Sequence, residues 1–175
     1  MKAFGTWALA LAIGLMTSTL ATAAVKVQLS DVHICCGACV KGIQNAVKDA
    51  GEAKVDIDRD GGSVTIETEN DATAQKVVDA IAAAGYHGSS DHATIKVKED
   101  AGAPSGKVTR LKLGGIHNCC GGCTNAIRDA VKGVSGVQAD TLTNRATEFV
   151  VEGDFEAAEV IKALYAAGFH AKVAK

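Results

Sequence analysis

Two tight cysteine triplets constrain this chain more than any other sequence feature. All six cysteines of the 175 residues lie in these triplets, at positions 35, 36 and 39 and at positions 119, 120 and 123. A histidine precedes each triplet, so the pattern H-x-C-C-G-x-C occurs twice, at an offset of 84 residues. A second shared stretch, Ala-Ala-Gly followed by an aromatic residue and a histidine, ends at His87 and again at His170. Two motifs repeated in the same order predict two homologous modules.

The repeat divides the chain into a first module over residues 24–100 and a second over residues 107–175. Residues 101–106 form a short linker that contains Pro104, the only proline of the sequence. Each module is close to the size at which one hydrophobic core is only marginally sufficient.

Residues 1–23 have the pattern of a secretory signal peptide. Lys2 is followed by an apolar run from Trp7 to Met16, and Ala21 and Ala23 have the A-x-A spacing of a cleavage site. A membrane anchor is the alternative, but the run is shorter than the roughly 18 apolar residues that a span needs. We therefore expect cleavage after Ala23, a periplasmic or extracellular protein, and no membrane span after cleavage.

Hydrophobic periodicity predicts the same order of elements in both modules. In the first module, Val25, Val27 and Leu29 alternate with polar residues, which is typical of a half-buried strand, and helical spacing follows from the second cysteine of the CxxC, Cys39. Two alternating runs then flank residues 60–62, a hairpin signal. A second helix should end before Gly85, and residues 94–97 should form the last strand after a loop over 88–92.

The second module repeats this order, with a helix from Cys123, a hairpin around Asn144 and a helix that ends before Gly168. Strand, helix, strand, strand, helix, strand predicts an α+β protein with two tandem ferredoxin-like βαββαβ domains.

With a CxxC between the first strand and the first helix, each module resembles the heavy-metal-associated (HMA) domains of small copper chaperones and of metal-transporting ATPases. The resemblance implies metal ligands at Cys36 and Cys39 in one module and at Cys120 and Cys123 in the other. The family places Met two residues before the first ligand, where this chain has Ile34 and Asn118. The remaining cysteines and the preceding histidines are additions to the family pattern: Cys35, Cys119, His33 and His117.

The chemistry of the triplets also favours a soft metal ion. A cysteine at the start of a helix is held as thiolate by the helix N–H groups and dipole. Cys35 and Cys119 are either third ligands or redox or bystander thiols, and His33 and His117 are either ligands or exposed strand ends. His87 and His170 are candidate ligands or hydrogen-bond donors, since the turn before the last strand of this fold should lie beside the metal loop. Two thiolates suffice for Cu(I), whereas a third thiolate or an imidazole favours trigonal Cu(I) or zinc.

We therefore expect an exported protein that binds copper as Cu(I), or zinc, with one ion per domain, for metal trafficking, buffering or detoxification. A metal-transporting or metal-receiving protein is the expected partner, and we expect no catalytic residue and no enzymatic activity. The alternative is a thiol-disulfide oxidoreductase that uses the CxxC pairs, although the only proline lies in the linker and not beside the motif. Nucleic-acid binding is not expected, because the net charge is −2 and only 4% of the residues are aromatic.

Overall fold

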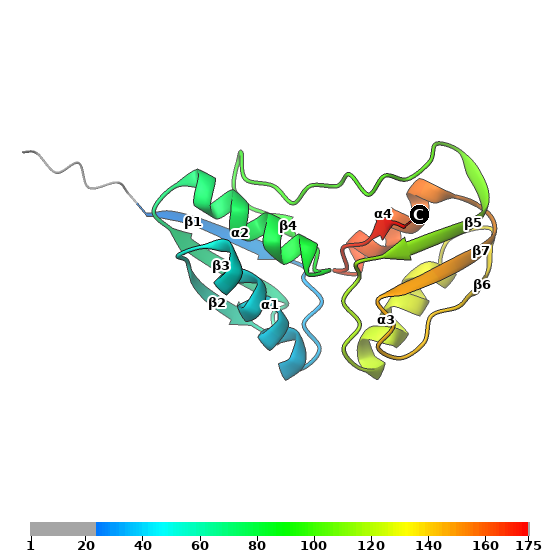
Figure 1. Ribbon diagram of the computed structural model, residues 1–175, viewed down its shortest axis with the longest axis horizontal. Helices are drawn as coiled ribbons and strands as arrows, with labels where there is room; N and C mark the ends of the chain where they lie inside the picture. Colours follow the sequence, from blue (N-terminus) through cyan, green and yellow to red (C-terminus); the bar gives the residue numbers. More distant parts are fainter. Residues whose placement is uncertain (1–23, 175) are drawn as a thin grey trace, which may run out of the picture.

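The computed structural model describes residues 24–174 as two modules that lie side by side (Figure 1). The predicted signal peptide, residues 1–23, lies outside the described residues, and so does Lys175. Within residues 24–174, no helix has both the length and the apolar character that crossing a bilayer would require.

The first module is a four-stranded antiparallel sheet with two helices, in the strand order β2-β3-β1-β4. The central strand β1 pairs with β3 along its length, and both helices pack against the sheet. The elements are β1 (Val25–Ser30), α1 (Gly37–Ala50), β2 (Lys54–Asp58), β3 (Ser63–Thr68), α2 (Asp71–Ala83) and β4 (Ser89–Ser90).

The second module repeats this topology, in the strand order β6-β7-β5-β8. The elements are β5 (Lys107–Gly114), α3 (Gly121–Lys132), β6 (Val137–Asp140), β7 (Glu148–Glu156), α4 (Ala157–Ala166) and β8 (Lys172–Val173). The α+β class with two ferredoxin-like domains is thus confirmed.

In each module, hydrophobic side chains are buried between the sheet and the helices, and the buried residues of the two modules form one continuous cluster. Strand alternation directs Val27 and Leu29 of β1 inward and leaves Lys26 and Gln28 outside. The helices contribute side chains at helical spacing, such as Ile43 of α1 in the first module and Ile127 of α3 in the second. Cys39 and Cys123 are fully buried and belong to these cores, so the second cysteine of each CxxC is anchored by packing.

Two details differ from the sequence-based prediction. The last strand of the first module is the two-residue β4, directly after the turn at Gly85, and residues 94–97 are not a strand. Ser90 pairs with Leu29 of β1, and His92 Nδ1 then accepts the N–H of Ile95 at 3.3 Å, so a turn replaces the predicted continuation. The first helix of each module also begins two residues earlier than predicted, at Gly37 and Gly121, because Cys36 and Cys120 are the N-cap residues.

The two modules are joined by the turns that precede β4 and β8. Tyr86 and Phe169 form an antiparallel bridge, in which the His87 N–H donates to the Gly168 carbonyl at 3.1 Å and the His170 N–H donates to the Gly85 carbonyl at 3.0 Å. The Val173 N–H also donates to the carbonyl of Ala101 at 2.8 Å, so the linker packs along the edge of β8. These contacts place the β1–α1 loop beside the β5–α3 loop (Figure 1).

Candidate metal centre

All six cysteine sulfurs meet at the junction between the modules. Nine Sγ···Sγ separations lie between 3.4 and 4.0 Å, and five of these connect one module with the other. All six thiols are free. Such a cluster offers several groups of three donor atoms within 4.8 Å of one another, and it is therefore compatible with the binding of a soft metal ion.

The two CxxC pairs occupy equivalent positions at the starts of α1 and α3. The sulfurs of Cys36 and Cys39 are 3.8 Å apart, and those of Cys120 and Cys123 are 3.9 Å apart. In each pair the first cysteine is the N-cap residue and is partly exposed, while the second lies in the first helical turn and is fully buried. One side of the cluster therefore faces the protein core and the other faces solvent.

The helix starts determine which cysteines are ionised. The backbone N–H of Cys39, followed by that of Ala38, stabilises the Cys36 thiolate and lowers the pKa of Cys36 to about 6. The N–H of Cys123 lowers the pKa of Cys120 in the same way. Loss of water around the clustered sulfur atoms, together with hydrogen bonds to neighbouring thiols, raises the pKa of Cys35 and Cys119 well above the usual value, so these thiols hold their protons in the metal-free protein.

His117 faces the buried side of the cluster. Its Nε2 lies 3.6 Å from the sulfur of Cys123 and 3.8 Å from that of Cys39, while its Nδ1 lies 3.2 Å from the carbonyl oxygen of Gly85. Because a carbonyl can only accept, Nδ1 carries the proton and Nε2 presents its lone pair to the two sulfurs. Burial lowers the pKa of His117 to about 4, so the ring is neutral at pH 7 and available as a ligand.

His33, the counterpart of His117 in the first module, has different surroundings. Its ring stacks on Phe169 at a centroid distance of 4.4 Å, and its buried Nε2 has no hydrogen-bond partner among residues 24–174. A ring nitrogen of His33 still lies within 4.8 Å of the sulfurs of Cys35 and Cys123. Both histidines of the repeated motif are therefore brought to the cluster, but only His117 is oriented by a hydrogen bond.

His87 and His170 are brought together with each other and not with the thiols. Their ring centroids are 6.0 Å apart, His87 stacks on Tyr165 at 4.0 Å, and neither histidine is in any of the donor groups found among residues 24–174. Side chains alternate along the Tyr86–His87 and Phe169–His170 segments. Tyr86 and Phe169 therefore point toward the cysteine loops, and the two histidines point to the opposite side.

The glycine of the repeated Ala-Ala-Gly-aromatic-His stretch has a role that sequence reasoning missed. Gly85 and Gly168 have φ values of +90° and +82°. A Cβ on Gly85 would collide with the backbone nitrogen of His117, and a Cβ on Gly168 would collide with that of His33. Each glycine ends a helix in its own module and also receives the cysteine loop of the other module. The only sequence signal was that these glycines are repeated together with the cysteines.

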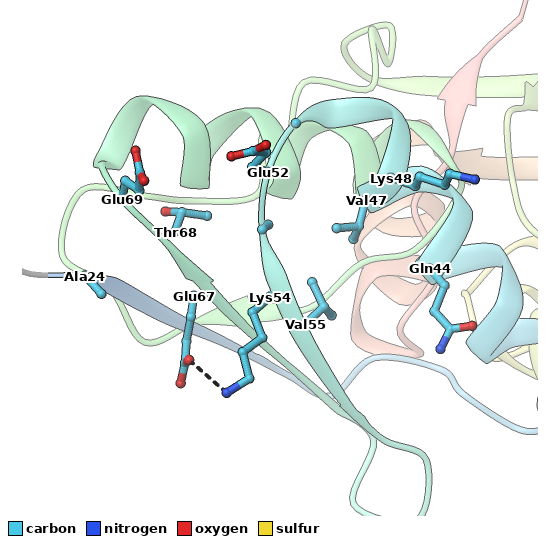
Figure 2. Close-up of a pocket in the computed structure, with 12 residues that line it drawn as sticks. Ala24, Gln44, Val47, Lys48, Glu52, Lys54, Val55, Glu67, Thr68 and Glu69 are labelled. Atoms are coloured by element: carbon cyan, nitrogen blue, oxygen red, sulfur yellow. Dashed lines mark ion pairs between the residues drawn. The ribbon is translucent and has the colours of Figure 1, made fainter.

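A separate hollow of about 800 Å³ lies at the outer end of the first module (Figure 2). Lys54 and Glu67 form an ion pair of 3.5 Å on its wall, and Val47 and Val55 line it from α1 and β2. No cysteine or histidine lines this hollow, so it is not part of the candidate metal centre.

Comparison with known proteins leaves the family of the chain open. No model of a protein family matches it, and no curated protein matches it. The N-terminal soluble domains of Bacillus subtilis CopA are similar in solution structure at 14% identity, over 87% of this chain and 95% of that chain, with a TM-score of 0.32. The first two RRM domains of the yeast poly(U)-binding protein Pub1 are similar at 9% identity, over 86% and 98%, with a TM-score of 0.25. Neither TM-score carries an argument about function.

Proposed function

We propose that this protein is an exported, non-enzymatic carrier or buffer of Cu(I), which it binds through cysteine thiolates at the junction of two HMA-like modules. The convergence of six free thiols within contact distance of one another is the observation that supports the proposal. The signal-peptide pattern of residues 1–23 supports export. The ion is the cargo of this protein.

Copper is favoured over zinc by the composition of the cluster. Six thiolates in two groups provide the soft, low-coordinate surroundings that Cu(I) prefers. Zinc would need four donors around one ion. His117 is the imidazole best oriented to add a donor to the thiols, and its Nε2 faces the two buried sulfurs together.

The exposure of the cluster suits transfer of an ion to and from a partner. Cys35 is exposed and Cys36 and Cys120 are partly exposed, so thiols of a metal-delivering or metal-receiving protein can reach them. The buried Cys39 and Cys123 hold the opposite side of the cluster away from water. Because Cys35 and Cys119 are protonated without metal, loading releases their protons and becomes more favourable as the pH rises.

The direct test is an anaerobic titration of the reduced exported protein with Cu(I) in competition with a chromophoric chelator, followed by the same titration with zinc. We expect two Cu(I) ions to be retained against a chelator that removes zinc. A variant with all six cysteines replaced by serine is the control, and it should retain neither metal. Retention of copper by this control, or preferential retention of zinc by the parent, would contradict the proposal.

Thiol-disulfide exchange is the second candidate, and the acidity of Cys36 favours it. A thiolate with a pKa of about 6 beside a second thiol at 3.8 Å is a competent nucleophile toward a disulfide. Reduction of a disulfide-linked peptide, measured before and after loading with Cu(I), separates the two functions. Catalytic turnover that is lost in Cys36→Ser would favour the oxidoreductase, whereas a slow stoichiometric reaction would favour the metal carrier.

A further inference from the structure

The two cysteines outside the CxxC motifs contact the motif of the opposite module. The Cys35 sulfur lies 3.4 Å from that of Cys120 and 3.5 Å from that of Cys123, but 3.7 Å from that of Cys39 in its own module. The Cys119 sulfur lies 3.4 Å from that of Cys39 and 3.6 Å from that of Cys36, and also 3.6 Å from that of Cys123 in its own module. In both modules, the shortest contact of the additional cysteine crosses the junction.

These contacts produce two equivalent triangles of sulfur atoms. Cys36, Cys39 and Cys119 form one triangle with sides of 3.4 to 3.8 Å, and Cys120, Cys123 and Cys35 form the other with sides of 3.4 to 3.9 Å. With metal–sulfur bonds of about 2.3 Å, three thiolates in a plane around one ion are about 4.0 Å apart, whereas two thiolates on opposite sides are about 4.6 Å apart. The CxxC separations of 3.8 and 3.9 Å fit the three-thiolate arrangement better.

Hydrogen bonds across the junction hold the loops that carry Cys35 and Cys119 in place. The His33 N–H donates to the Gly168 carbonyl at 3.4 Å, two residues before Cys35, and His117 Nδ1 donates to the Gly85 carbonyl, two residues before Cys119. Each cysteine loop is therefore fixed to the turn of the opposite module. The donor is a backbone N–H on one side of the junction and a ring nitrogen on the other, so both loops are fixed, but by different groups.

We propose that the modules exchange their third ligand: Cys119 completes a three-thiolate Cu(I) site with Cys36 and Cys39, and Cys35 completes the matching site with Cys120 and Cys123. This inference rests on the proposed function, since it names the ligands of the same ions. It has a consequence for the whole molecule, because each bound ion then links the two modules and the loaded junction is stiffer than the metal-free one.

The test uses the exported protein with one CxxC removed, so that a single site remains. In Cys120→Ser/Cys123→Ser, loaded anaerobically with one equivalent of Cu(I), X-ray absorption should show three sulfur ligands. Adding Cys119→Ser should reduce the number to two, although Cys119 belongs to the module whose motif has been removed. Adding Cys35→Ser, the neighbour of the remaining motif, should leave three, and it is the matched control.

The reciprocal background, Cys36→Ser/Cys39→Ser, should reverse the roles of Cys35 and Cys119. Far-UV circular dichroism of each variant verifies that the modules are folded, and serine changes the side-chain volume little. Loss of a sulfur on Cys35→Ser in the first background, or no loss on Cys119→Ser, overturns the exchange while the proposed function remains. If the parent protein binds no Cu(I), the proposed function itself is wrong, and the exchange fails with it.

Discussion

His33 and His117 occupy the same position of the same repeated motif, yet the junction gives them different surroundings. His117 donates from Nδ1 to the Gly85 carbonyl and directs Nε2 toward Cys39 and Cys123. His33 stacks on Phe169, and its Nε2 has no hydrogen-bond partner in the part of the chain that the structure describes. The residue that follows also differs, since Ile34 packs in the core whereas the Asn118 amide donates to the carbonyls of Thr143 and Ala146. A repeated motif thus specifies which residue types reach the cluster, while packing specifies how each one is used.

The largest expected effect comes from removing one CxxC pair at a time. With Cys36→Ser/Cys39→Ser, we expect the number of tightly bound Cu(I) ions to fall from two to one, because Cys120, Cys123 and Cys35 still form a complete site. The corresponding change in the second module should have the same effect. Metal analysis after gel filtration gives the number of ions. Loss of both ions from either variant would show that all six thiols form one indivisible cluster instead of two separate sites.

The two histidines of the motif should differ in their effect on affinity. Replacing a residue that orients or supplements metal ligands typically weakens binding by about 10- to 100-fold. We expect a loss in this range for His117→Ala, because only His117 presents an oriented nitrogen to the buried thiols. His33→Ala should change affinity by less than His117→Ala does. Chelator competition measures both, and equal losses would mean that the two positions are used alike.

Two glycines with nearly the same φ allow the junction to be tested without changing a cysteine. Gly168 and Gly106 have φ values of +82° and +83°, but a Cβ on Gly106 would meet nothing within 4 Å. Gly106→Ala should cost only the left-handed strain of about 1–2 kcal/mol. Gly168→Ala should cost more, because the new Cβ also collides with the backbone of His33. Urea unfolding of the reduced, metal-free protein gives the free energy of unfolding. Equal losses in the two variants would mean that the close contact between Gly168 and His33 does not contribute to stability.

The smallest expected effect is on the pH dependence of the free energy of unfolding. It concerns His87 and His170, which lie on the opposite side of the bridge from the cysteine cluster. Burial lowers the pKa of His87 and of His170 to about 4, and Lys172 acts in the same direction on His170. Glu99 lies 3.8 Å from His87 Nε2, and Tyr165, whose pKa burial raises to about 12, stays neutral beside both rings.

Since the unfolded chain binds protons near pH 6.5 and the folded protein does not, the free energy of unfolding should fall as the pH drops from 6.5 toward 4. Between pH 7 and pH 6, the two side chains together should account for about 1 kcal/mol. His87→Gln/His170→Gln should therefore flatten this part of the stability profile of the metal-free protein. The remaining slope belongs to His33 and His117, whose pKa values are also lowered by burial, and to Cys36 and Cys120, whose pKa values the N–H groups at the helix starts lower. An unchanged slope in the double variant would mean that His87 and His170 are protonated in the folded state.

The sequence by itself determined the features that depend on local patterns. Alternation in β1 and helical spacing after each CxxC predicted both ferredoxin-like modules, and the paired glycines predicted the ends of α2 and α4. The short β4 was missed because Gly88, Ser89 and Ser90 show no hydrophobic alternation. Without it, the sequence does not predict that Ser89 and Ser90 pair with β1.

Only the tertiary structure decided how the repeated residues are combined. Adjacent side chains of an extended segment point in opposite directions, so His87 and His170 cannot share the side of Tyr86 and Phe169, and the sequence does not say which side faces the thiols. In the same way, the chain contains two complete cysteine triplets. The sulfur atoms nearest to those of Cys35 and Cys119, however, belong to cysteines 85 and 80 positions away in the sequence. Those contacts depend on how the two modules dock. Docking is set by backbone hydrogen bonds and by the close approach at Gly85 and Gly168, and neither has a periodicity that can be read along the chain.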